Sequence, residues 1–209
     1  YAANRQAFWL VVEGFDLVRD RLGELPVHID FIDFEHPEHN IFRVVNQYSV
    51  QGKRRRRPDL LLFINGIPVS IWEFKTAIEE DTTIHDAWEQ ITIRYQRDIP
   101  NLLKYCFLSV ICDGANTRLG SIFTPYRFYY AWNKANDTDT VAHGISSLMT
   151  MIEGAFAKDR ILQILRDFVF YPDDSAKDEV IVCRYPQFFA AEKMLAHIKQ
   201  HMRPAGDGK

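Results

Sequence analysis

The amino-acid sequence predicts an α/β fold in which a mixed sheet is flanked by helices and a mainly helical extension follows. Alternating or continuous apolar runs predict strands at residues 28–34, 42–50, 60–64, 69–74 and 105–112. Apolar residues at helical spacing predict helices at 4–22 and 81–95. This combination of strands and helices is typical of a sheet covered by helices.

Residues that favour turns and caps set the limits of these elements. The Asn65–Gly66 pair lies between two apolar runs and predicts a hairpin. Asp81 or Thr82 is the expected cap of the second helix, which ends before the segment Asp98–Pro100. A further strand is expected at 128–132.

A polar segment at 133–141 divides the sequence. It has no large apolar residue before Val141, which is typical of a linker. We therefore predict one domain at 1–135 and a mainly helical region at 136–209. The elements expected in that region are helices at 146–157, 160–168 and 186–201 and a short strand at 179–184.

The composition excludes several classes of protein. The chain has 209 residues, of which 47% are hydrophobic, enough for one sizeable core. Its three cysteines lack the spacing of a disulfide framework or a zinc site, which favours a reducing, cytoplasmic compartment. No apolar run is long enough to cross a membrane, so we expect a soluble chain without membrane contact. A net charge of -3 indicates that any contact with DNA is local.

Two acids and a lysine lie on the strands of the predicted hairpin. Asp59 directly precedes one strand, and Glu73 and Lys75 end the next. Because side chains alternate along a strand, Glu73 and Lys75 share a face. Acid and lysine pairs are common on surface strands, but this strand is otherwise mainly apolar. Burying such charges without a partner or a ligand is costly, which favours a functional site.

The register of the hairpin decides whether Asp59 joins the other two side chains. A strict two-residue loop would place Asp59 opposite Trp72, on the wrong face. A three-residue loop, Ile64–Gly66, avoids this if its glycine is left-handed and forms a G1 bulge. Asp59 then lies opposite Ile71 and diagonal to Glu73, and we predict this bulged loop.

Two carboxylates at this spacing can share one hard cation. We expect Mg²⁺ bound by Asp59 and Glu73, with the carbonyl of Phe74 as a further ligand. A phosphodiester resists attack because its oxygens are negatively charged. Such a cation binds one of these oxygens and also lowers the pKa of a water, which makes the water a better nucleophile. Lys75 is expected to orient that water and offset charge in the transition state. The predicted catalytic residues are therefore Asp59, Glu73 and Lys75.

A basic run, Lys53–Arg57, lies immediately before these acids. Charge runs are usually exposed and solvated. The position of this one indicates a second interpretation, in which Arg55, Arg56 and Arg57 bind DNA phosphates and bring the backbone to the cation. The sequence leaves both interpretations open.

The residues around the hairpin resemble a known family. The segment Arg57–Lys75, R-P-D-L-L-L-F-I-N-G-I-P-V-S-I-W-E-F-K, closely resembles the nuclease core of type I restriction enzyme subunits. The likeness extends to the segments Asn46–Tyr48, Arg94–Pro100, Asp113–Asn116 and the aromatic segment that ends at Trp132. Nearly the whole chain is covered.

This resemblance implies a PD-(D/E)xK nuclease domain at 1–135. It also implies a Mg²⁺-dependent endonuclease that cuts double-stranded DNA within a complex, where methylation and specificity subunits supply the sequence specificity. The segment Arg184–Ala190 resembles the one that precedes the family's ATP-driven motor, in which Gln187 would approach the nucleotide. No phosphate-binding G-x-x-x-x-G-K-[ST] loop follows, so ATP is expected in the full-length subunit only.

Two positions depart from the family's pattern. The nuclease helix of the family often carries glutamine and tyrosine four residues apart, whereas Gln90 and Tyr95 lie five apart, about 140° out of phase on an α-helix. Gln90, which shares a face with Arg94, is favoured as a DNA contact and Tyr95 as a packing residue. Glu13 is the candidate for an acid that related nucleases place near the metal from the first helix, although an exposed helix residue is the simpler interpretation.

Other functions stay open. The chain would also suit a docking module that links the motor to the restriction complex and has a catalytically silent site. Metal binding discriminates between these functions. A repair or recombination nuclease of the same fold is disfavoured by the region that leads towards a motor. His197 and His201 are one helical turn apart but lack the acidic motif of a metal site, so surface positions are expected for them.

Overall fold

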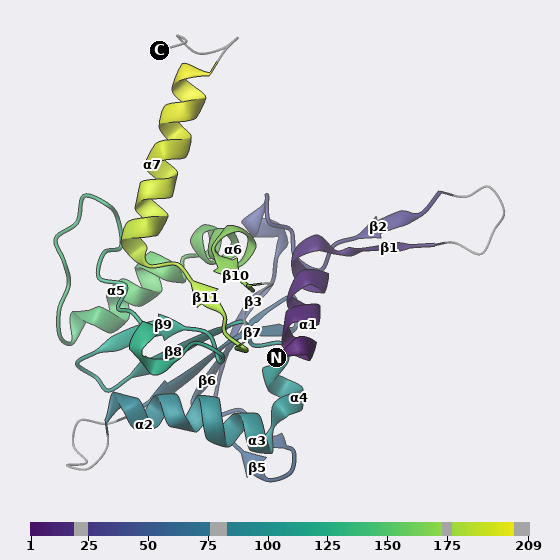
Figure 1. Cartoon of the computed structure of the whole chain (residues 1–209), viewed down its shortest axis with the longest axis vertical. Helices are drawn as coiled ribbons and strands as arrows, with labels where there is room; N and C mark the ends of the chain where they lie inside the picture. The colour runs from purple at the N-terminus through teal and green to yellow at the C-terminus, as the bar shows by residue number, and fades with distance from the viewer. Residues whose placement is uncertain (19–24, 76–82, 173–176, 203–209) are drawn as a thin grey trace.

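The computed structural model describes residues 1–18, 25–75, 83–172 and 177–202. A five-stranded mixed sheet forms its centre, in the order β3-β6-β7-β8-β9 (Figure 1). The strands are β3 (Phe42–Asn46), β6 (Leu60–Ile64), β7 (Ile67–Phe74), β8 (Leu108–Cys112) and β9 (Thr117–Gly120). Only the β7–β8 pair among them is parallel. The predicted mixed sheet flanked by helices is confirmed.

The parallel pair requires a crossover, which is helical. It is made of α2 (Ile84–Glu89), the π-helix η2 (Gln90–Tyr95), α3 (Gln96–Asp98) and α4 (Pro100–Leu103). Its apolar residues, among them Ile91, pack against Leu61 and Ile71 of the sheet. The crossover therefore covers the face of β6 and β7 on which Leu61 and Ile71 lie.

The opposite face of the sheet is covered by α1 (Ala2–Glu13), α5 (Ser146–Ala155) and α6 (Lys158–Asp167). Phe8 of α1, Met151 of α5 and Leu162 of α6 belong to one buried cluster with Trp72 and Val110 of the sheet. The helices expected at 146–157 and 160–168 are thus confirmed. The division of the chain into domains at 135 stays a prediction.

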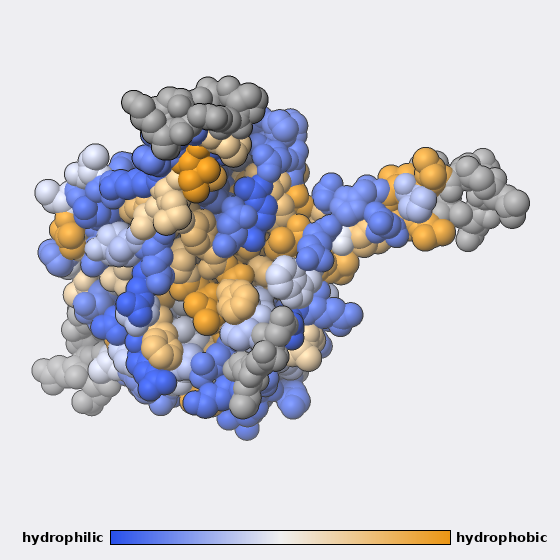
Figure 2. Space-filling model, turned by 45° about the horizontal axis from the view of Figure 1, so that its top comes forward, coloured by the Kyte–Doolittle hydropathy of each residue, from blue (hydrophilic) through white to orange (hydrophobic). Residues whose placement is uncertain are grey.

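The first helix is shorter than expected. It ends at Glu13, and Gly14 follows with a left-handed φ of 68°. The chain then forms β1 (Phe15–Leu17), which pairs with β2 (Val27–Ile29) in an arm that projects from the body (Figure 1). The helix predicted to Leu22 is wrong, because glycine permits a turn at which a two-stranded ribbon begins. Hydrophobic residues are exposed along this arm (Figure 2), including Phe15 and Leu17.

Two further strands are interrupted. The one expected at 28–34 ends at Ile29 and leads into a short 3₁₀ helix, η1 (Pro37–His39). The one expected at 42–50 breaks at Gln47, which has a φ of 51°, before β4 (Val50–Gln51) pairs with β5 (Arg55–Arg56). A residue with positive φ cannot continue the pleat, which explains the interruption.

Other boundaries differ less. The expected caps Asp81 and Thr82 lie outside the described residues, and Thr83 caps α2 in a capping box with Asp86. Instead of a strand at 128–132 the chain forms the 3₁₀ helix η3 (Tyr126–Phe128) and a single bridge between Leu119 and Tyr130.

The C-terminal elements match the expectation. The short strand expected at 179–184 is β11 (Ile181–Val182), which pairs with β10 (Val169–Phe170), and the last helix is α7 (Tyr185–His201). Figure 1 shows α7 extending away from the body. Among the described residues, no helix combines the length and apolarity needed to span a membrane.

Candidate active site

The turn between β6 and β7 has two residues. Asn65 and Gly66 both have left-handed φ angles, 50° and 85°, and Ile64 pairs directly with Ile67. Positive φ at both central residues is the property of a type I′ hairpin turn. The three-residue loop predicted from the sequence is therefore wrong.

A bulge inside the hairpin nevertheless shifts the register. Phe63 pairs with Pro68 but Leu62 pairs with Ser70, which leaves Val69 unopposed. Proline has no N–H for a ladder hydrogen bond, so an irregularity beside it is expected. From there Leu60 lies opposite Trp72. Asp59 directly precedes β6, and this register, continued by one position, puts Asp59 level with Glu73. In this continued register the two acids share a face as predicted, but they are opposed instead of diagonal.

The carboxylate of Asp59 is held at both oxygens. The backbone N–H of Phe74 donates to Oδ2 at 2.8 Å, and Nε2 of Gln47 donates to Oδ1 at 2.7 Å. The backbone N–H of Gln47 also donates to the Asp59 carbonyl at 2.9 Å. Sequence reasoning missed this role of Gln47, whose only signal was its place in the Asn46–Tyr48 likeness.

Glu73 lies at the centre of a polar network and is 3% exposed. The hydroxyl of Tyr95 donates to its Oε2 at 3.0 Å, and Nε2 of Gln90 donates to its Oε1. Nζ of Lys75 lies 3.3 Å from Oε1 and donates to Oε1 of Gln90 at 2.6 Å. The structure therefore brings Asp59, Glu73 and Lys75 together, as the sequence predicts.

The π-helix brings both Gln90 and Tyr95 to this network. Its wider turn stacks residues five positions apart, which an α-helix separates. Nε2 of Gln90 consequently donates to the Tyr95 hydroxyl at 2.8 Å. The expectation that Tyr95 only packs is wrong, because it assumed a regular α-helix.

Burial and a neighbouring acid shift the protonation of Glu73. Removal from water and the charge of Asp59 raise its pKa to about 7, although Lys75 and the hydrogen bond from Tyr95 oppose the shift. Burial and the nearby Glu73 carboxylate raise the pKa of Tyr95 above its usual range. Tyr95 therefore remains a neutral hydrogen-bond donor.

The donor set fits a hard divalent cation. Each carboxylate oxygen offers two lone pairs, and the contacts above leave at least one free on Oε2 of Glu73 and on both oxygens of Asp59. When both carboxylates are ionised, the single ammonium of Lys75 leaves an excess of negative charge at a largely buried position. A cation with oxygen ligands would offset that excess. The Phe74 carbonyl stays a predicted ligand.

Comparison with known proteins identifies the family. Residues 1–128 match the family described as the type I restriction enzyme R protein N terminus. The chain belongs to this family.

Its relatives are endonuclease subunits by name. The chain is 30% identical over 205 residues to the putative type I restriction enzyme MjaIXP endonuclease subunit of Methanocaldococcus jannaschii, covering 88% of this chain and 19% of that protein. It is 25% identical over 196 residues to the type I restriction enzyme HindI endonuclease subunit of Haemophilus influenzae, covering 91% of this chain and 18% of that protein. The chain thus spans about a fifth of the length of these relatives. It corresponds to the N-terminal region of type I restriction enzyme R proteins.

The arginines of the basic run have different environments in this R-protein region. Arg56 bonds through Nε to Oδ2 of the buried Asp98 at 2.7 Å, and Arg97 binds the same carboxylate. Arg55 and Arg57 are exposed. Arg56 therefore fastens the β4–β5 ribbon to the crossover. Contact with DNA stays a prediction for all three arginines and for Gln90.

Two other predicted residues lie away from the acids. Glu13 is exposed at the end of α1, on the face of the sheet opposite to Glu73, so the structure does not bring it to the site. Gln187 accepts a hydrogen bond from the backbone N–H of Arg184 at 2.9 Å, beside a cavity of about 300 Å³. Its contact with a nucleotide stays a prediction.

Proposed function

We propose that this region is the Mg²⁺-dependent nuclease domain of a type I restriction enzyme R subunit, of the PD-(D/E)xK type. It would hydrolyse phosphodiester bonds of double-stranded DNA. The observation that carries the proposal is that Asp59 lies beside Glu73, with its carboxylate bonded to the N–H of Phe74 on β7, while Lys75 is bonded to Glu73. The names of the relatives support an endonuclease.

The protein's own residues prepare this chemistry. Gln90 and Tyr95 hold Glu73, while Gln47 and the backbone of Phe74 hold Asp59. Carboxylates that are already fixed suit a cation, because little side-chain entropy is lost when the cation binds. The bound cation would supply Lewis-acid activation of a water and of the phosphate.

Lys75 suits a role at the phosphate. Its ammonium has three protons, of which two are directed to Glu73 and Gln90. The third is available to the attacking water or to a phosphate oxygen. Its positive charge would stabilise the transition state, in which negative charge accumulates on the phosphoryl oxygens.

The remaining parts of the proposal concern the assembly. Methylation and specificity subunits would select the DNA, and an ATP-driven motor would lie in the rest of a full-length subunit, in the cytoplasm. The second candidate is a docking module with a silent site. It is favoured by one observation, that both oxygens of Glu73 already have donors from the protein itself.

Plasmid cleavage by the assembled enzyme with Mg²⁺ and ATP tests the proposal. Asp59→Ala and Lys75→Ala should abolish cleavage and leave ATP hydrolysis in the same samples unchanged. Asp159→Ala and Lys199→Ala are matched controls, because both side chains are exposed on α6 and α7. Cleavage that persists in the two site variants would overturn the nuclease assignment and favour the docking module.

A further inference from the structure

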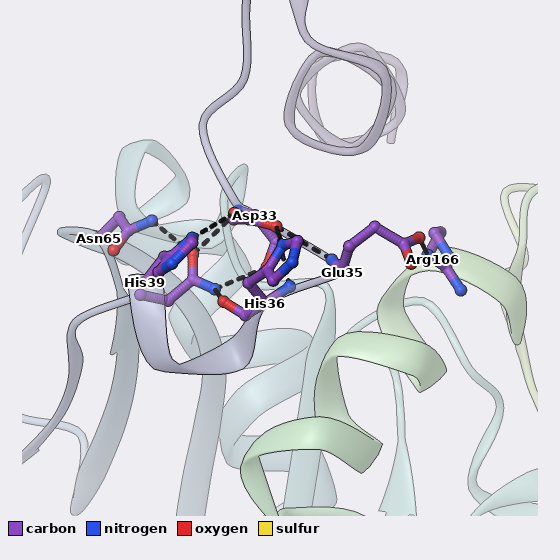
Figure 3. A network of polar contacts seen from close by, with 7 residues as sticks. Asp33, Glu35, His36, His39, Asn65 and Arg166 are labelled. Atoms are coloured by element: carbon purple, nitrogen blue, oxygen red, sulfur yellow. Dashed lines mark hydrogen bonds and ion pairs between the residues drawn. The ribbon is translucent and has the colours of Figure 1, made fainter.

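We propose a second cation site in this chain, built from Asp33, His36 and His39, that takes a divalent transition metal of the zinc class. The three residues lie on the turn that links the arm to β3 and includes η1. One possible ligand atom from each lies within 4.8 Å of the others. Figure 3 shows the two imidazole rings gathered at the carboxylate of Asp33.

The distances suit a shared ion. Nδ1 of His39 lies 2.8 Å from Oδ2 of Asp33, and Nδ1 of His36 lies 3.5 Å from Oδ1. Ligands of a tetrahedral zinc ion with bonds of about 2.1 Å are separated by roughly 3.4 Å. The two rings are stacked at 4.9 Å with an interplanar angle of 20°. Small rotations of exposed side chains would therefore bring all three donors onto one ion.

The backbone of the turn holds the carboxylate independently of the two imidazole rings. Oδ1 of Asp33 accepts hydrogen bonds from the backbone N–H groups of Glu35 and His36, at 3.0 and 2.9 Å. Asn40 bonds to both the N–H and the carbonyl of Asp33, and Asn65 bonds to Asn40. An aspartate that only caps this turn would need neither imidazole ring. The two rings thus add nitrogen donors to a carboxylate that is already positioned.

The donor set differs from that of the Asp59–Glu73 pair. Imidazole nitrogens favour zinc, copper, nickel and cobalt, whereas an all-oxygen set favours magnesium. The side chains of His36, His39 and Asp33 are 58%, 59% and 37% exposed, so an ion can reach them from solvent. Three protein ligands leave a fourth position for water.

A metal here would restrain a turn that contacts two other parts of the fold. Glu35, within the same turn, forms an ion pair with Arg166 of α6 (Figure 3). Asn65 connects the turn to the β6–β7 hairpin. An ion that links Asp33 to His39 would therefore restrain the turn from which these contacts to α6 and to the hairpin are made.

Calorimetric titration of the 209-residue chain with Zn²⁺ in excess Mg²⁺ tests the site. Excess Mg²⁺ occupies sites that have oxygen ligands alone. His36→Asn combined with His39→Asn should weaken one Zn²⁺ binding event by more than about tenfold, since even outer partners of metal ligands contribute about that much. The matched control is His197→Asn with His201→Asn, because those two rings lie 4.3 Å apart on α7. This control should retain the event.

Two further measurements show whether a loss of Zn²⁺ binding comes from the missing imidazole ligands or from unfolding. With Co²⁺ the control variant should show visible absorption bands, and the His36/His39 double variant should not. The single variant His36→Asn preserves the bond between His39 and Asp33, so it should stay folded and still bind Zn²⁺ more weakly. Unchanged Zn²⁺ affinity in the folded double variant would overturn the proposal.

Discussion

The amide of Gln90 donates to the hydroxyl of Tyr95 at 2.8 Å, although five positions separate the two residues. The π-helix makes this contact by widening one turn of the crossover. Both residues then reach the carboxylate of Glu73 from the same side of the helix. A local irregularity of the backbone therefore completes the candidate site.

The hydroxyl of Tyr95 should matter for the site more than for the fold. Tyr95→Phe removes the donor to Oε2 of Glu73 and preserves the packing of the ring. We expect cation affinity to fall by about 10–100-fold, as for other partners of metal ligands. Calorimetry with Mn²⁺ measures the change. Tyr126→Phe, in η3, is the control, and an unchanged affinity in Tyr95→Phe would show that this bond is dispensable.

Glu73 should make stability depend on pH when no divalent cation is present. Its pKa is about 7 in the folded chain and 4.5 in the reference state, so the folded state binds the proton more tightly. The stability from this group is present below pH 4.5 and is lost as the pH rises towards 7, on the order of 1–3 kcal/mol. Urea unfolding at pH 5 and pH 8 checks this. Glu73→Gln should have the same free energy of unfolding at both pH values. If this variant loses as much stability between pH 5 and pH 8 as the wild type, the assignment to Glu73 is contradicted.

Gln47 should act on Asp59 through its side chain. Gln47→Ala removes the bond to Oδ1 of Asp59, and we expect cation affinity to fall by about tenfold. Gln47→Gly removes the same bond but suits the positive φ of this position, so it should be about 1 kcal/mol more stable than the alanine variant. Calorimetry and urea unfolding separate the two effects. Wild-type affinity in both variants would argue against a positioning role.

Arg56 and Arg57 should differ although they are adjacent. Arg56→Ala takes one of two arginine partners from the buried Asp98 and should cost about 1–3 kcal/mol of stability. Arg57→Ala should leave stability unchanged. If Arg57 binds a phosphate, the variant should reduce the slope of log K for DNA binding against log salt concentration by about one. Thermal unfolding and DNA titrations at several salt concentrations distinguish these effects. The reverse pattern would contradict both assignments.

Much of the site could be predicted from the sequence because its signals are local. The apolar runs beside Asn65–Gly66 predict the hairpin, and alternation along a strand predicts that Glu73 and Lys75 share a face. Counting residues on either side of the turn also shows that the register must shift by one residue to bring Asp59 to that face. These inferences require only the regular geometry of strands and turns.

The tertiary structure decided where the regular geometry fails. The shift occurs at Val69 inside β7, beside Pro68, and not in the turn. The π-helix, the left-handed Gln47 and the end of α1 at Gly14 are further interruptions of a regular pattern. Periodicity describes uninterrupted elements, whereas packing on both faces of the sheet determines where an extra residue is accommodated. The sequence by itself predicted the residues of the candidate site, Asp59, Glu73 and Lys75, and tertiary packing decided which neighbours hold them.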